Sequence, residues 1–298
     1  MSQNDDDQKT NELGYGTTGH SWDGIEEWNN PMPKWWVWTF WATVVWGILY
    51  TIAYPAWPLI ERATPGILGQ STRADVAADI AAVNERNASL NEALAGIDLT
   101  TLADDADLHG YAVNKGRSVF LNNCSQCHGA GAAGVQAAGY PNLLDDAWLW
   151  GGQIDEIAYT VSHGIRNEQS LDARWSEMPA FGEILGEEEI AGVVQYVRQI
   201  SGQEHEAALA AAGAETFLNE CASCHGEQGM GDQSLGAPNL TDAIWLYGGS
   251  VETLTETVVN ARFGVMPAWN EEFRGANGLT DAEINAVAAY VHQLGGGQ

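Results

Sequence analysis

Two short segments carry the residues whose types and spacing most clearly indicate chemistry. Each has two cysteines separated by two residues and followed directly by a histidine: Cys124, Cys127 and His128 in the first, Cys221, Cys224 and His225 in the second. This spacing is typical of c-type haem attachment, in which both thiols form thioether bonds and the histidine binds the iron. A zinc site would need four ligands per motif, and the chain has no other cysteines. A thioredoxin-like pair would not need the histidine. We therefore expect two covalently bound haem c groups.

The composition narrows the classes of partner. The chain has 298 residues with 40 acidic and 12 basic side chains, which gives a net charge of −28. A nucleic acid would be repelled by this charge, so we expect no nucleic-acid partner. Two interpretations of the acidity stay open. It favours docking of a basic protein partner, or it only keeps the protein soluble or suits a salty habitat.

An apolar segment near the N-terminus is long enough to cross a bilayer. The 20 residues from Trp35 to Tyr54 contain no charge, and Trp and Tyr cluster at both ends, as expected at membrane interfaces. Pro55 and Pro58 are expected to end the helix. More than thirty polar and acidic residues precede the run, so we interpret it as an uncleaved anchor rather than a signal peptide. Membrane lipid is therefore an expected partner.

The orientation of the anchor follows from the haem motifs better than from charge. Only Lys9 and Lys34 precede the span, and Arg62 and Arg73 follow it, so the positive-inside signal is thin. In bacteria haem c is attached on the outer side of the inner membrane. We therefore expect a single-pass inner-membrane protein with residues 1–33 cytoplasmic and residues 61–298 periplasmic.

The segment that follows the anchor shows a helical pattern. Six apolar residues recur at alternating spacings of four and three along residues 73–97 and are expected to form one face of a helix: Val76, Ile80, Val83, Leu90, Leu94 and Ile97. Asn87 occupies the one position of this stripe that is not apolar. We expect this face to pack on a haem domain or on a partner. The alternative is a lone spacer helix.

The two haem motifs belong to a longer internal repeat. An offset of 97 residues relates "YPNLLDDAWLWGG" to "APNLTDAIWLYGG" and also relates Gly116 to Gly213. The offset falls to 88 at the Met-Pro-Ala-aromatic segments of Met178 and Met266. The first copy therefore carries nine extra residues between Ile165 and Met178.

Each copy has the pattern of a small helical domain. A first helix leads into the haem motif, a middle helix follows, and a last helix closes the copy; Thr280 and Glu283 form a predicted capping box. Gly116 and Gly213 are expected to let the last helix cross closely, near Tyr196 and Tyr290. This pattern resembles class I cytochrome c. The predicted fold is mostly α, with one N-terminal transmembrane helix and two tandem class I cytochrome c domains. The predicted segments are 1–33 (cytoplasmic), 34–60 (anchor), 61–109 (helical linker), 110–202 (domain 1) and 203–298 (domain 2).

Methionine is the favoured sixth ligand of each iron. Met1 and Met32 lie on the other side of the predicted span, which leaves Met178, Met230 and Met266. Met178 and Met266 share one setting and follow their histidines by 50 and 41 residues, enough chain to reach the opposite haem face. We therefore expect His128 to pair with Met178 and His225 to pair with Met266.

Met230 and the remaining polar candidates receive weaker assignments. The position equivalent to Met230 in the first copy is Ala133, so Met230 is not expected to be a ligand. Five other histidines are interpreted as surface residues: His20, His109, His163, His205 and His292. In c-type domains the Pro-Asn-Leu segment lies by the haem edge. Four side chains are therefore either haem-edge donors or plain packing residues: Asn142, Asn239, Trp148 and Trp245.

The N-terminal segment carries a more specific pattern than the haem motifs. It reads "GHSWDGIEEWNNPMP" and leads directly into the apolar run. Its pattern residues are Gly19, Trp22, Asp23, Gly24, Ile25, Glu27, Asn29 or Asn30, Pro31 and Pro33. Together with the two haem motifs, the chain resembles subunit III, the diheme cytochrome c subunit, of the cbb3-type cytochrome c oxidases, over nearly its whole length.

The resemblance implies a role in electron transfer. The family accepts electrons from the cytochrome bc complex or a cytochrome c and passes them to the monohaem subunit and the catalytic haem–copper subunit, which reduces oxygen. No catalytic site of its own is expected, because both irons are closed by methionine and the sequence shows no copper site. One alternative is the cytochrome subunit of a periplasmic dehydrogenase or a free-standing anchored electron shuttle. Another is a diheme peroxidase, which would need an iron that opens to peroxide.

Overall fold

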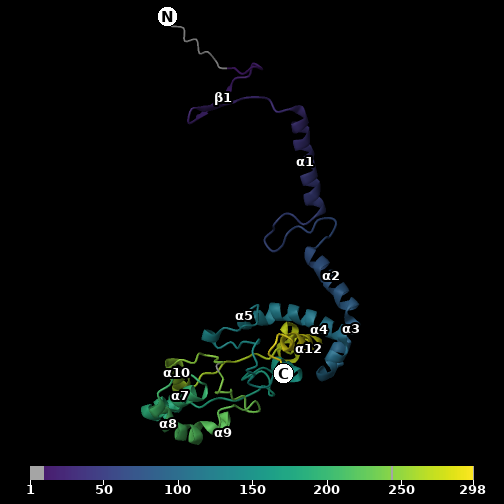
Figure 1. Ribbon diagram of the computed structural model, residues 1–298. Coiled ribbons are helices and arrows are strands. Elements are labelled where there is room, and N and C mark those ends of the chain that lie inside the picture. Colours follow the sequence, from purple (N-terminus) through teal and green to yellow (C-terminus); the bar gives the residue numbers. More distant parts are fainter. Residues whose placement is uncertain (1–9, 243, 298) are drawn as a thin grey trace. The chain divides into compact units, whose positions relative to one another are not determined.

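The computed structural model describes residues 10–242 and 244–297 and is mostly helical, as predicted (Figure 1). It divides into two compact units, Met1–Glu85 and Arg86–Gln298. The first unit contains the hairpin strands β1 (Thr17–Trp22) and β2 (Ile25–Trp28) and the helices α1 (Lys34–Ala53) and α2 (Thr72–Arg86).

Helix α1 coincides with the predicted membrane span. It is the one helix among the described residues that is long and apolar enough to cross a bilayer, and none of its residues is buried. It ends at Ala53, two residues before Pro55. The following loop folds back, so that the backbone N–H groups of Ile67 and Leu68 donate to the carbonyls of Ile52 and Ala53, at 3.0 and 3.1 Å. These bonds satisfy carbonyls that a helix end otherwise leaves without partners.

The predicted continuous stripe over residues 73–97 is divided by the structure into two helices. Helix α2 ends at Arg86, and α3 (Ala88–Gly96) begins after Asn87. Leu94 on α3 is fully buried in the second unit, as predicted for a face that packs on a haem domain. The α2 part of the stripe remains exposed, at Val76, Ile80 and Val83. The haem-bearing unit therefore begins about twenty residues earlier than the predicted boundary at residue 110.

The second unit repeats one set of elements twice. The first set comprises α4 (Ala106–Val119), η2 (Phe120–Cys124), α5 (Ser125–His128), η3 (Gln136–Ala138), α6 (Ile154–His163), η4 (Phe181–Glu183) and α7 (Glu187–Ile200). The second comprises α8 (Ala207–Thr216), η5 (Phe217–Cys221), α9 (Ala222–His225), α10 (Val251–Asn260), α11 (Glu271–Arg274), η6 (Gly275–Asn277) and α12 (Asp281–His292). A short helix, η1 (Leu99–Asp104), precedes them. The capping box of Thr280 and Glu283 at the start of α12 is confirmed.

The two sets exchange their last helices. Helix α4 of the first repeat packs against α12 of the second, and α7 of the first repeat packs against α8 of the second. Two hydrophobic cores result. We call the one built by α3, α4, α6 and α12 module A, and the one built by α7, α8 and α10 module B. The chain leaves module A after α6 and returns to it after α10.

Small residues allow these exchanged helices to approach closely, as the sequence predicts. A Cβ atom on Gly116 of α4 would overlap the carbonyl oxygen of Ala286 in α12, and one on Gly213 of α8 would overlap the backbone of Gly192 in α7. The ring centroids of Phe120 and Tyr290 lie 5.5 Å apart in module A. The equivalent pair in module B, Tyr196 and Phe217, lies at 5.1 Å.

The repeat boundaries at residues 202 and 203 therefore do not coincide with the packing units. The physical reason is that both copies carry a glycine, a phenylalanine and a tyrosine at equivalent positions of the helix crossing, so either last helix fits either first helix. The connection from α7 to α8 spans only residues 201–206. A link this short places neighbouring helices side by side.

A glycine substitution tests the close crossing in module A. Gly116→Ala is expected to lower the free energy of unfolding of the haem-loaded protein by about 1–3 kcal/mol, because the added methyl group overpacks the interface with α12. Gly110→Ala, on the same helix, is the matched control. A Cβ there meets no atom within 4 Å, so stability is expected to stay or to rise by up to about 1 kcal/mol. Equal effects of the two substitutions in denaturant titration would contradict the crossing.

Candidate haem sites

Each motif histidine is oriented by one backbone carbonyl. The Nδ1 atom of His128 lies 3.2 Å from the carbonyl oxygen of Pro141, and Nδ1 of His225 lies 3.0 Å from that of Pro238. A carbonyl can only accept, so Nδ1 carries the proton and Nε2 keeps its lone pair for a metal. Burial lowers the pKa of both imidazoles, while the bond to the proline carbonyl opposes this shift. Both histidines are therefore suited to binding iron in the neutral form.

The loops that follow the histidines bring these carbonyls into place. In the first copy the backbone N–H of Gly134 donates to the carbonyl of His128 at 2.9 Å, and Leu143 donates to Ala132 at 2.8 Å. The second copy repeats the first of these bonds between Gly231 and the carbonyl of His225, at 2.8 Å. The Pro-Asn-Leu segment is thus a structural support of the histidine.

Two cysteines of the haem motifs, Cys124 and Cys221, are the N-cap residues of the one-turn helices α5 (Ser125–His128) and α9 (Ala222–His225), and Cys127 and Cys224 lie within these helices. Cys124 and Cys221 are partly buried, while Cys127 and Cys224 are exposed. Burial raises the pKa of Cys124 and of Cys221 to about 11, with smaller contributions from Cys127 at the first site and from Glu220 and Cys224 at the second. Before haem attachment these two thiols are therefore protonated near neutral pH. One π-helical turn, η2 or η5, precedes each motif and ends at its first cysteine.

Met266 lies in the module of the first haem motif, and the segment just after Met178 packs in module B. Met266 packs against the core of module A, to which Cys124 also belongs, and exchanges two backbone hydrogen bonds with Ile165, at 2.9 and 3.0 Å. Helix η4, three residues after Met178, contacts α7 and α10 of module B. A Cβ atom on Gly182 of η4 would press on Val259 of α10. The predicted pairing of each histidine with the methionine of its own repeat does not agree with this packing.

Met230 lies outside both candidate sites. Its side chain is 63% exposed, although it follows His225 by only five residues. Met230→Leu is expected to leave the thioether-to-iron absorption band of the oxidised protein unchanged. The reduction potentials of both haems should also stay unchanged, because the Met230 sulfur faces solvent. Visible spectra of the purified protein provide the measurement. Loss of part of the band in this variant, with retention in Met266→Leu, would contradict the assignment.

Two glutamines missed by the sequence reasoning connect the modules. Gln136 donates from Nε2 to the carbonyl of Trp245 at 2.6 Å, and Gln233 donates to the carbonyl of Trp148 at 3.2 Å. Trp148 packs on module A and Trp245 on module B, so each glutamine reaches across to the other module. The 97-residue offset relates Gln136 to Gln233, and this repetition could have identified the two glutamines from the sequence.

The two predicted asparagines have a structural role. Asn142 accepts a bond from the backbone N–H of Leu144 at 3.0 Å, and Asn239 accepts from that of Thr241 at 2.9 Å. Each bond closes a turn within the loop. The side-chain oxygens therefore stabilise the loop, in line with the packing alternative.

The nine-residue insertion folds back over α6 of its own repeat. Arg174 pairs with Glu156 and lies over the ring of Tyr159, with 4.8 Å between its guanidinium carbon and the ring centroid. It also lies 5.5 Å from the centroid of Trp150. Leu171, at the outer bend, is fully exposed. The insertion therefore covers part of α6 in the first repeat.

A buried hydrogen-bond donor that no described residue pairs with, the indole of Trp150, indicates whether the residues around the motifs fit haem. The indole Nε1 of Trp150 is buried and has no hydrogen-bond partner among the described residues. Haem carries two carboxylate side chains, which accept such bonds, and the Trp150 ring presses on Gly236 in the loop after His225. This unpaired donor, the neutral histidines and the two Met-Pro segments together form a donor set suited to haem c.

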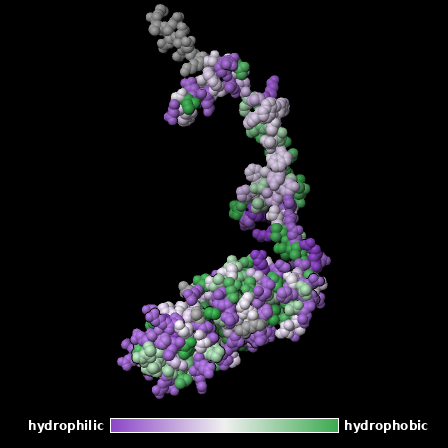
Figure 2. Space-filling view, viewed as in Figure 1, coloured by the Kyte–Doolittle hydropathy of each residue, from purple (hydrophilic) through white to green (hydrophobic). Residues whose placement is uncertain are grey.

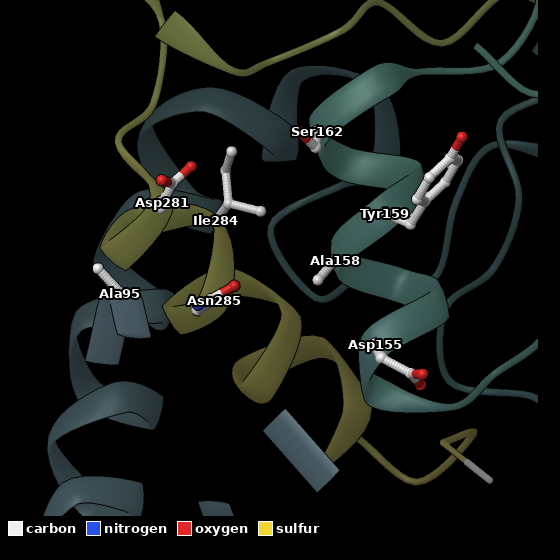
Figure 3. A pocket seen from close by; sticks show the side chains of 8 residues that line it. All are labelled: Ala95, Asp155, Ala158, Tyr159, Ser162, Asp281, Ile284 and Asn285. Atoms are coloured by element: carbon white, nitrogen blue, oxygen red, sulfur yellow. The ribbon is translucent and has the colours of Figure 1, made fainter. Parts of the chain in front are cut away.

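A shallow depression in module A is separate from these sites (Figure 3). It has a volume of about 290 Å³ and lies between α3, α6 and α12. Its lining residues are Ala95, Asp155, Ala158, Tyr159, Ser162, Asp281, Ile284 and Asn285. The lining includes no cysteine, histidine or methionine, so this depression is not a haem crevice.

Comparisons with known proteins show similarity to haem c proteins of one oxidase family over most of the chain. Residues 14–61 match the N-terminal domain of cytochrome oxidase-cbb3, FixP; residues 112–197 match cytochrome c oxidase, cbb3-type, subunit III; and residues 210–295 match cytochrome c. The chain is 60% identical over 284 residues to the cbb3-type cytochrome c oxidase subunit CcoP of Cereibacter sphaeroides, covering 95% of each chain. The chain belongs to the family of cbb3-type cytochrome c oxidase subunit III.

Other members of this family align with the chain over a similar length. The CcoP subunit of Rhodobacter capsulatus is 53% identical over 287 residues, and the FixP subunit of Azorhizobium caulinodans is 46% identical over 286 residues. The alignments cover 95% and 96% of this chain. Membership confirms the predicted electron-transfer role, the two covalently bound haem c groups and the other oxidase subunits as partners. With the apolar helix α1, it also supports a membrane-anchored protein.

Proposed function

We propose that this chain relays electrons through its two haem c groups from a cytochrome c or the cytochrome bc complex to the monohaem and haem–copper subunits of the oxidase. The observation that carries this proposal is the pair of CxxCH motifs whose histidines are both oriented by a proline carbonyl. Bound haem c supplies one-electron chemistry, because its iron changes between the ferric and ferrous states. The protein's contribution is to hold, insulate and present the two groups.

We also propose an exchanged set of axial ligands. His128 pairs with Met266, and His225 pairs with Met178. Three observations support this pairing: Cys124 and Met266 pack on the same core, η4 beside Met178 packs on α10, and both helix crossings are exchanged between the repeats. Cys124 and Cys127 hold the first haem, and Cys221 and Cys224 hold the second. Thioether ligation raises the reduction potential of a histidine-ligated haem, which suits electron transfer.

The exchange gives the proposed relay a rigid geometry. Each module contains helices from both repeats, and the chain passes from module A through module B and back, so two connections join the modules. Gln136 and Gln233 add a hydrogen bond in each direction across the interface. Two electron carriers held in one body keep a constant separation, which a flexible link between two independent domains would not ensure.

The anchor orients the haem-bearing unit in this proposal. Residues 1–33 lie in the cytoplasm, α1 spans the bacterial inner membrane, and the haem-bearing unit lies in the periplasm. The visible face of this unit is covered largely by hydrophilic side chains (Figure 2). Residues 61–298 carry 33 acidic and 10 basic side chains, and this net charge of −23 would attract a basic electron donor over a distance that salt shortens.

Ionic strength tests this steering. Turnover of the purified oxidase with a basic cytochrome c is expected to fall at least tenfold between low salt and about 0.3 M salt, because screening slows association. A small neutral electron donor serves as the control and should show little dependence. A flat response with the basic cytochrome c would remove the docking interpretation and leave the acidity as an adaptation for solubility or habitat.

Co-purification tests the proposed place in the oxidase. The tagged full-length chain, extracted from membranes in mild detergent, is expected to retain a haem–copper subunit and a monohaem cytochrome c. Retention of a dehydrogenase instead would favour the alternative of a dehydrogenase cytochrome subunit. Purification of the chain alone with both haems in place would favour the free-standing shuttle.

A further inference from the structure

The hairpin before the membrane helix is a built element rather than a loose tail. Asp23 and Gly24 form its two-residue turn, with φ angles of 48° and 82°, as a type I′ turn requires. Asn11 holds its base: Nδ2 donates to Oδ1 of Asn30 at 2.5 Å, and Oδ1 accepts from the backbone N–H of Tyr15 at 2.9 Å. The chain therefore maintains a defined shape over about twenty residues.

This hairpin presents apolar side chains that no described residue covers. Trp22 pairs with Ile25 across the strands, so both side chains lie on one face, and they are 72% and 71% exposed. No residue of β1 or β2 is buried. A two-stranded hairpin alone is marginally stable in water and usually needs another surface to pack on. The face of Trp22 and Ile25 is therefore an interaction surface.

The charge around this face indicates the occupant. Residues 1–33 carry seven carboxylates against one lysine, so the segment that holds the hairpin is strongly acidic. Glu27 lies two residues beyond Ile25 on the same face, and Asp23 lies in the adjoining turn. Anionic lipid headgroups would repel these groups. Cytoplasmic loops of multi-spanning membrane proteins are rich in lysine and arginine and would attract them.

We propose that the face of Trp22, Ile25 and Glu27 docks on the basic cytoplasmic loops of a multi-spanning membrane subunit of the same oxidase. This inference rests on the proposed function, because that proposal places residues 1–33 in the cytoplasm. The tryptophan and isoleucine supply the buried contact, and Glu27 pairs with a basic side chain of the loop. The hairpin would then hold the cytoplasmic end of α1 against the oxidase.

Substitutions on opposite faces of the hairpin test the docking. Trp22→Ala combined with Ile25→Ala, in the full-length chain expressed with the other subunits, is expected to reduce the co-purified multi-spanning subunit at least fivefold. Trp28→Ala is the matched control, because Trp28 lies on the other face, and less than a twofold change is expected. Likewise, Glu27→Gln should reduce the amount of multi-spanning subunit that co-purifies in moderate salt more than Glu26→Gln does, because Glu26 lies on the other face. Haem staining and membrane yield confirm that each variant inserts and carries haem.

A photo-crosslinking amino acid at position 22 gives a second readout that does not depend on assembly yield. The expected adduct joins this chain to a cytoplasmic loop of the multi-spanning subunit. An adduct only with phospholipid, or only with a second copy of this chain, would overturn the inference, as would unchanged co-purification of the double variant. If the unaltered chain retains no oxidase subunit, the proposed function itself fails; if it retains them and the double variant does too, only the docking fails.

Discussion

Met266→Leu is expected to remove the thioether ligand from one haem iron while both haems stay covalently attached. The reduction potential of that haem should fall by on the order of 0.1 V, part of the roughly 0.8 V range that axial ligands control. About half of the thioether-to-iron band of the oxidised protein should disappear. Redox titration followed in the visible spectrum measures both effects.

Two variants frame this result. Met178→Leu is expected to give the same loss at the other haem, because both methionines share the Met-Pro-Ala-aromatic setting. Met230→Leu, with its exposed sulfur, should change neither quantity. An unchanged band in Met266→Leu would mean that this methionine binds neither iron.

Removing the first haem attachment is expected to destabilise a helix far away in the sequence. In the double variant Cys124→Ala with Cys127→Ala, module A loses the haem that its attachment motif would hold and the contacts made with that haem. Because α12 packs on α4 and α6, amide hydrogens of α12 should exchange at least 100-fold faster, which corresponds to about 3 kcal/mol of lost local stability. Hydrogen exchange followed by mass spectrometry resolves the individual helices.

The same experiment contains its own control. Helices α7 and α8 of module B should keep their protection, although α7 belongs to the first repeat. If α7 lost protection together with α4 while α12 kept it, each repeat would fold as its own domain. That outcome would contradict the exchanged packing.

Local chemistry was predictable from the sequence because spacing determines it. The CxxCH motifs, the uncharged run before Pro55 and the 97-residue offset each depend on residues close together in the chain or on direct identity between copies. Gly116 and Gly213 predicted a close helix crossing correctly, since only a residue without a Cβ fits there. The capping box of Thr280 and Glu283 is a similarly local signal.

Which helix packs against which could not be predicted from local sequence in the same way. The crossing residues are alike in both copies, so the sequence does not distinguish α4 on α7 from α4 on α12. Arg174 stood out as part of an insertion, but its position over Tyr159 depends on how the loop folds back. The stripe of residues 73–97 has one period, yet Leu94 is buried while Val76, Ile80, Val83 and Leu90 are exposed. These features follow from tertiary packing rather than from local pattern.

The most direct test of the exchanged modules uses chains that carry a single haem. With Cys124→Ala and Cys127→Ala in place, only the haem held by Cys221 and Cys224 remains. In this background Met178→Leu is expected to abolish the thioether-to-iron band, while Met266→Leu leaves it intact. Loss of the band in Met266→Leu with retention in Met178→Leu would contradict the exchange and restore the pairing within each repeat.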